Sequence, residues 1–199
     1  MTTIKKNVFT TMANLSLSLL LLGTACGQKN ENEKTAKIDN SKTEVVGETP
    51  KMDMMAAILS DNLDVVEQHI KAGTNINKKD AISGSTPLIT AASFGKEKIA
   101  KALIDGGADL TIKNNDGATA LHTAAFFCRV EIVQLLIDAN ADKSARNNFG
   151  ATPRETVMGP FEDIKPIYQM LQQQFSPMGL QIDLEEVEKT RPVVAMMLQ

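Results

Sequence analysis

The sequence of 199 residues lacks tryptophan and holds only one tyrosine, two histidines and two cysteines. Two cysteines are too few for a disulfide-dense scaffold or for a zinc site with four thiolates. Basic residues are not in excess either, because 21 Lys and Arg stand against 24 Asp and Glu. This slightly acidic balance argues against a nucleic-acid partner, whose phosphates require a basic face. The rest of the composition, 43% hydrophobic and 23% charged, is typical of one globular domain with tails.

The first 25 residues have the pattern of a secretory signal. Two lysines near the start are their only charged residues, and an apolar run follows from Leu15 to Leu22. This run is too short to span a bilayer. It ends in Leu22-Gly23-Thr24-Ala25-Cys26, which resembles the lipobox of bacterial lipoproteins. The resemblance implies a signal peptide over 1–25 and lipidation of Cys26. A freely secreted protein, cut at the same place, is the alternative.

Residues 26–51 are polar and mixed in charge, with no apolar period. Such a stretch cannot bury enough surface to fold, so a disordered tether is expected. Acyl chains on Cys26 would anchor it firmly in a membrane. The predicted location is therefore the bacterial cell envelope, on the outer membrane facing the periplasm if the source is Gram-negative.

Self-similarity at a spacing of 33 residues marks most of the remaining chain. The run Gly84-Ser85-Thr86-Pro87-Leu88 returns as Gly117-Ala118-Thr119-Ala120-Leu121 and as Gly150-Ala151-Thr152-Pro153. Ile99–Ile104 returns as Ile132–Ile137 at the same spacing. These motifs resemble the ankyrin repeat. The resemblance implies an all-α solenoid of helix-turn-helix units with hairpin loops, which binds proteins.

Capping signals support the same helices independently. Thr86, Thr119 and Thr152 suit helix N-caps. Gly95 and Gly107 are placed where two helices should end in a left-handed residue, and Asn replaces the second glycine one repeat later. Each unit has one apolar side per helix, so it must stack on neighbours to bury that side.

Four repeats are predicted over 52–175, with the boundaries 52–82, 83–115, 116–148 and 149–175. The fourth carries an insertion at Gly159-Pro160, and its second helix is expected at Ile167–Leu171. Residues 176–199 are expected to cap the last repeat, with docking to a partner as the alternative. Within them 183–189 favours a short helix, whereas 193–198 fits either a strand or a second helix.

No pattern of catalytic or metal-ligating residues is present, so neither an enzyme, a cofactor nor a metal is expected. His122 occupies the His position of the ankyrin Thr-Pro-Leu-His motif, and the resemblance implies a hydrogen bond between repeats. Cys128 stands where Gly95 stands one repeat earlier. It is interpreted as a tolerated small residue, with a redox-sensitive thiol as the alternative. The methionines are interpreted as gap fillers at the two ends of the stack, with copper(I) binding as the alternative.

The ankyrin resemblance implies a concave binding face made of hairpin tips and exposed positions of the first helices. Apolar residues at displayed positions are uncommon unless they contact something, and aromatic residues are favoured anchors. The alternative is that these rings pack against one another or against residues near the insertion. The candidate partner-binding residues are Phe94, Phe126, Phe127, Asn115, Asp116, Asn148 and Phe149.

The sequence thus predicts a monomeric, non-catalytic protein-interaction module with an unidentified protein partner. Some periplasmic bacterial ankyrin proteins are linked to catalase function, and this chain resembles them in repeat type and export signal. Support of a periplasmic enzyme such as catalase is therefore the alternative function. A small hydrolase or metal-binding protein would need a site that the sequence does not contain.

Overall fold

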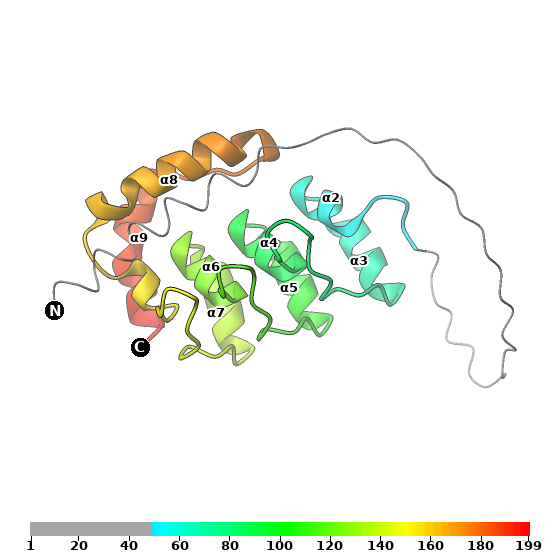
Figure 1. Ribbon diagram of the computed structural model, residues 1–199. Helices are drawn as coiled ribbons and strands as arrows, with labels where there is room; N and C mark the ends of the chain where they lie inside the picture. Colours follow the sequence, from blue (N-terminus) through cyan, green and yellow to red (C-terminus); the bar gives the residue numbers. More distant parts are fainter. Residues whose placement is uncertain (1–48) are drawn as a thin grey trace, which may run out of the picture. The chain divides into compact units, whose positions relative to one another are not determined.

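A computed structural model describes residues 49–199 of the protein (Figure 1). The predicted signal peptide (1–25), the predicted lipidation site Cys26 and the predicted tether up to residue 48 lie outside the described residues. Within 49–199, no helix combines the length and apolar character that a membrane crossing requires.

Three helix pairs follow one another in the first part of the stack (Figure 1). First helices stack on first helices and second helices on second helices, so that the pairs form two layers. Each of the first three predicted units contains one pair. The first helices are α2 (Met54–Leu59), α4 (Pro87–Ser93) and α6 (Ala120–Phe126), and the second helices are α3 (Leu63–Lys71), α5 (Glu97–Asp105) and α7 (Val130–Asp138).

The predicted caps bound these helices. Thr86 accepts a hydrogen bond from the backbone N–H of Ile89, and Thr119 accepts one from His122. Left-handed residues end both helices of a pair, at Gly95 and Gly107 as predicted. Non-glycine residues fill the equivalent positions elsewhere: Asp61 (φ 58°), Cys128 (φ 52°) and Asn140 (φ 61°). Their side chains cost conformational energy that glycine would not.

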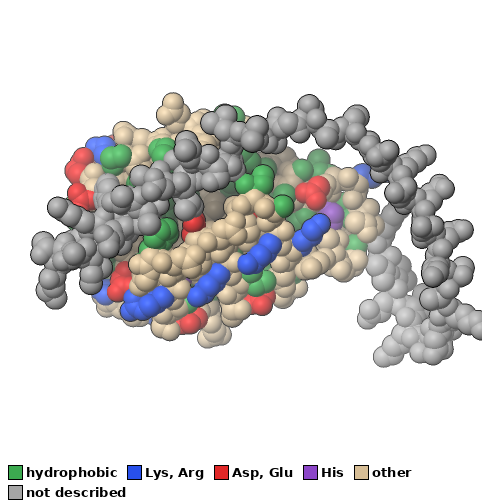
Figure 2. All heavy atoms as spheres, viewed as in Figure 1, with side chains coloured by type: hydrophobic (Ala, Val, Ile, Leu, Met, Phe, Trp, Pro, Cys, Tyr) green, Lys and Arg blue, Asp and Glu red, His purple; other side chains and the backbone are tan. Residues whose placement is uncertain are grey.

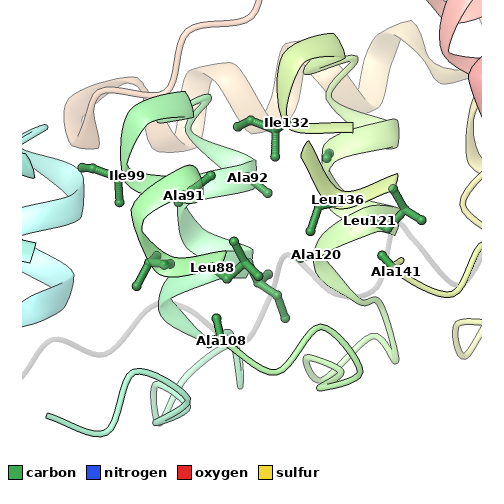
Figure 3. Close-up of a cluster of buried hydrophobic side chains, with 14 of the residues drawn as sticks. Leu88, Ala91, Ala92, Ile99, Ala108, Ala120, Leu121, Ile132, Leu136 and Ala141 are labelled. Atoms are coloured by element: carbon green, nitrogen blue, oxygen red, sulfur yellow. The ribbon is translucent and has the colours of Figure 1, made fainter. Parts of the chain in front are cut away.

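The core repeats with the same period as the sequence. Leu88 and Leu121 are both 1% exposed, and Ile99 and Ile132 are equally buried one repeat apart (Figure 3). Small alanines such as Ala91 let neighbouring helices approach closely. Because each layer buries its apolar side only against the next, the stack depends on interfaces between repeats.

The fourth unit differs from its prediction. Only a single turn of 3₁₀ helix, η2 (Glu155–Val157), stands where a first helix is expected, and it packs on α6. Residues 167–171 do not form the second helix of this unit, since they belong to α8 (Phe161–Phe175), which lies across the stack (Figure 1). That second-helix place is taken by α9 (Leu184–Met197), which packs on α7. Residues 176–199 therefore supply part of the last repeat, with 193–197 helical.

Apolar spacing alone does not decide which of α8 and α9 takes the second-helix position of the last unit, although it favours helix in both segments. Val187, Val194 and Leu198 of the α9 segment are buried, and the latter two join the core of the repeats. In α8 only Tyr168 is buried, so this helix cannot fill an interior layer. Both segments have helical periodicity, and only the fit against α7 distinguishes them.

Substitution of Asn140 tests the left-handed helix end. Asn140→Ala should lower the free energy of unfolding by about 1 kcal/mol, because a Cβ without a compensating polar group disfavours positive φ. Asn140→Gly should preserve or raise it. The side chain is exposed, so loss of packing does not complicate the comparison. Urea unfolding of the three proteins measures the effect, and equal stabilities for the two variants would contradict it.

Candidate functional site

The stack has two edges on which partner-binding residues were predicted. One edge carries the hairpins between repeats, with Asn115, Asp116, Asn148 and Phe149. The other lies where the first helices end, with the remaining three phenylalanines.

Helix α8 covers the edge where the first helices end. Its apolar residues recur every three or four positions and face a second hydrophobic cluster, separate from the core of the repeats. The rings of Phe94, Phe126 and Phe127 belong to this cluster and are only partly exposed. The side chains that α8 contributes are Phe161, Ile164, Tyr168, Leu171 and Phe175.

Tyr168 is the centre of this contact. It is fully buried, its ring lies 4.8 Å from that of Phe126, and its hydroxyl donates a hydrogen bond to the Phe126 carbonyl at 2.5 Å. Phe126 also makes an edge-on contact with Phe127, at 5.1 Å between ring centroids. The expectation that these rings are displayed to a partner therefore needs correction. The insertion after Gly159 supplies a helix of the same chain that packs on them, as the alternative interpretation anticipated.

Two arginines lie beneath α8 and its return loop. Arg129 donates to the carbonyl of Ser93 at 3.4 Å and to that of Gln181 at 2.8 Å, and so ties the loop to the second and third repeats. Its Nε is buried and has no hydrogen-bond partner within residues 49–199. Arg191 of α9 donates to the Tyr168 hydroxyl at 3.4 Å. Desolvation lowers the pKa of Arg129, whereas burial raises that of Tyr168.

Cys128 lies under the same cover. Its Sγ lies 3.8 Å from the Val187 carbonyl oxygen. Burial raises the pKa of the Cys128 thiol to about 11, despite the opposing fields of Arg191 and Arg129. A thiol in this environment is unreactive near neutral pH, which favours the small-residue interpretation over the redox one.

The hairpin edge is held together by a ladder of hydrogen bonds. The Asn115 amide donates to the Ile82 carbonyl at 2.8 Å, and the Asn148 amide donates to the Asn115 carbonyl at 2.9 Å. These side chains lie so close to the preceding hairpin glycines that a Cβ on Gly117 would fall 2.4 Å from the Asn148 Oδ1. Asn115 and Asn148 are exposed, as predicted for a binding edge, but their amides also fix the spacing of the hairpins.

Asp116 and Phe149 are half-buried at the same edge. Desolvation raises the pKa of the Asp116 carboxyl. Cations also recur here, in line with the row of Lys and Arg side chains that Figure 2 shows across this face. Three exposed basic residues, Lys79, Lys113 and Arg146, recur at spacings of 34 and 33 residues. This recurrence is visible in the sequence, although these residues are not among the predicted site residues.

The histidines serve the scaffold. His122 Nε2 donates to the Ala151 carbonyl at 3.0 Å, which confirms the hydrogen bond expected between repeats, and Nδ1 accepts from Thr119. Desolvation lowers the pKa of His122, consistent with a neutral ring. His69 contacts Thr74 and the Met52 carbonyl. In the described part of the chain, no three His, Cys, Asp or Glu side chains are grouped to hold a metal ion.

The geometry defines a class: a stack of helix pairs with a rigid hairpin edge is an ankyrin-repeat solenoid. Residues 54–147 match the family model for ankyrin repeats (3 copies). The ankyrin domain of Bcl-3, a member of the IkappaB family, has a similar fold, with a TM-score of 0.51 and 24% identity over 58% of this chain and 50% of that one. The predicted all-α ankyrin fold is thereby confirmed, and ankyrin repeats indicate a protein–protein interaction module.

Particular relatives share only the repeats. Human protein phosphatase 1 regulatory subunit 27 is 44% identical over 61 residues, which are 31% of this chain and 39% of that protein. Rat ankyrin repeat and SAM domain-containing protein 6 is 32% identical over 71 residues, or 36% of this chain and 8% of that protein. The chain thus spans well under half the length of these relatives.

The buried thiol should make stability depend on pH. A raised pKa stabilises the folded state below the pKa of an unfolded thiol, near 9, and this contribution is lost as the pH rises toward 11. Between pH 8 and pH 10 the free energy of unfolding of the protein should fall by about 1 kcal/mol more than that of the Cys128→Ala variant. Parallel pH profiles of the two proteins from denaturant unfolding would contradict a buried neutral thiol.

Tyr168→Ala should loosen α8. It removes the largest side chain that α8 buries, so the free energy of unfolding should fall by about 3 kcal/mol. Maleimide labelling of Cys128 should accelerate, because its cover is weakened, while circular dichroism retains most of the helix signal. Gln169→Ala, an exposed position on the same helix, is the control. An unchanged labelling rate in Tyr168→Ala would show that α8 does not protect the thiol.

Proposed function

We propose that the protein is a non-catalytic binding module, anchored in the bacterial cell envelope through a lipid on Cys26, which holds a protein partner at its hairpin edge. The envelope location rests on the sequence of residues 1–26, with its two lysines, apolar run and lipobox-like ending. The observation that supports the binding site is the rigid, exposed hairpin edge. Helix α8 covers the aromatic cluster at the other edge and does not cover the hairpins.

The rigidity of the hairpin edge favours recognition. Asn115 and Asn148 fasten each hairpin to the one before it, so little conformational entropy remains to be lost on binding. Phe149 offers a half-buried aromatic anchor. The residues proposed to contact the partner are Asn115, Asp116, Asn148 and Phe149. Phe94, Phe126 and Phe127 pack against α8 instead.

The cations of the hairpin edge favour a partner with acidic groups. Lys79 and Lys113 are exposed and make no ion pair among the described residues, whereas Arg146 is paired with Glu155 at 3.0 Å. Exposed charges at a rim mainly steer association. A relative that is a regulatory subunit of a phosphatase supports an enzyme as the kind of partner, and the proposed envelope location allows one such as catalase.

Charge reversal at the hairpins tests this function. Cross-linking in intact envelopes, followed by mass spectrometry, should identify a protein whose recovery falls about tenfold with Lys79→Glu/Lys113→Glu, since the acidic partner is then repelled. Lys98→Glu/Lys101→Glu on α5 makes the same change of charge away from the hairpins and should retain the partner. Equal recovery with both double variants would refute the hairpin site, and recovery of the chain in the cytoplasm would refute the location.

Phe149→Ala tests the aromatic anchor. Affinity for the partner identified by cross-linking should fall about tenfold, because truncation of an anchoring ring typically costs more than 1 kcal/mol. Surface plasmon resonance measures the affinity, and thermal unfolding verifies that the variant is folded. An unchanged affinity with lowered stability would assign Phe149 to the scaffold instead.

A further inference from the structure

A pocket of about 440 Å³ lies at the C-terminal end of the stack, where η2, the start of α8 and α9 meet. It uses none of the residues of the hairpin edge, so its function is independent of the proposed partner site. Its walls combine two cations with apolar side chains. The residues that matter most for its chemistry are Arg154, Val157, Met158, Phe161, Arg191 and Met196.

Arg191 is a buried cation without a counter-ion among the residues that the structure describes. The residue is only 4% exposed. Its two hydrogen bonds, to the Tyr168 hydroxyl and the Gly159 carbonyl, are both long at 3.4 Å. No Asp or Glu of residues 49–199 makes an ion pair with it. Arginine is rarely buried without a paired charge, because desolvation of the cation is then uncompensated.

Arg154 adds a second positive charge to the same pocket. Its Nε donates to the Ala195 carbonyl at 3.1 Å, a contact that fixes the side chain beside α9. It forms no ion pair within the described residues either. Glu188 is the one acidic side chain among the lining residues, and it is exposed. The lining as a whole therefore favours an anion.

The other walls favour an apolar group. Met158 is 50% exposed and Met196 is 62% exposed, so these side chains leave apolar surface open to solvent at the pocket. The interpretation of the methionines as gap fillers thus fails for these two, although it holds for Met54, which is buried in the core. Flexible thioether side chains adapt to ligands of different shape.

We propose that this pocket binds a carboxylate carried on a short apolar stem, with Arg191 and Arg154 holding the carboxylate and Val157, Met158, Phe161 and Met196 enclosing the stem. Guanidinium groups match carboxylates in geometry and form strong, charge-assisted hydrogen bonds. Two sources supply this chemistry, a free aliphatic acid and the C-terminus of a peptide that ends in an aliphatic residue.

Titration of the full-length chain with matched probes tests both parts of the ligand. Hexanoate should shift NMR signals of the pocket residues, whereas acetate, which lacks the stem, and hexanol, which lacks the charge, should each bind at least tenfold more weakly. N-acetyl-Ala-Ala-Leu with a free carboxylate, compared with its amide, represents the peptide source. Whichever of hexanoate and the peptide acid binds with the higher affinity shows whether the carboxylate comes from a free acid or from a peptide C-terminus. Failure of both acids to bind more tightly than their neutral analogues would overturn the proposal.

Variants locate the binding in this pocket. Arg191→Gln should weaken binding of the acids about tenfold, through loss of a charged hydrogen-bond donor, while leaving hexanol unaffected; Lys189→Gln on the same helix is its control. Met196→Glu places a negative charge at the pocket without disturbing a buried residue, and should also weaken the acids. Met178→Glu, at an exposed methionine outside the pocket, should not. Equal binding of the acids to Met196→Glu and Met178→Glu would overturn the assignment even if Arg191→Gln failed to fold.

Discussion

The interface between neighbouring repeats is the interaction on which the whole structure depends. A helix pair such as α4 and α5 has an apolar side that water would otherwise contact, and only the next pair can cover it. Consequently every repeat needs a neighbour, and the ends of the stack need a different solution. At the C-terminal end α9 completes the last layer after a detour of the chain through α8. The apolar side of the last repeat is thus covered by a helix whose sequence does not follow the repeat pattern.

The position of α8 determines which surface of the stack remains exposed to other molecules. Because α8 lies on the rings of Phe94, Phe126 and Phe127, the most hydrophobic candidates for binding are engaged within the chain. The hairpin edge keeps its exposed amides and lysines, in an arrangement made rigid by hydrogen bonds between successive hairpins. The same segment also helps to form the pocket between η2, α8 and α9, beside Arg191, a cation that no acidic side chain of residues 49–199 neutralises. The segment after Gly159 therefore both covers the aromatic rings and supplies part of the pocket wall.

Much of the fold was predictable because short-range interactions determine where the helices begin and end. Thr86 and Thr119 cap helices by bonds to residues three positions ahead, and Gly107 ends one through its own backbone freedom. The bond from His122 to Ala151 was likewise implied by its motif. The candidate site was predicted less well, since Asn115 and Asn148 are exposed as expected whereas the aromatic anchors are covered. The exposure of a side chain depends on segments that are distant in the chain. The sequence around a phenylalanine is the same whether a distant helix covers its ring or leaves it exposed.

The sequence by itself determined the period of 33 residues and the helix pairs over residues 54–138, because capping, turn chemistry and apolar spacing act over a few residues. Tertiary structure alone decided that α9 rather than residues 167–171 completes the last layer, that Tyr168 seals the aromatic cluster, and that Arg191 is buried beside a pocket. Those outcomes join residues far apart in the chain, where many pairings have similar apolar patterns. Only shape and burial in three dimensions select one of them.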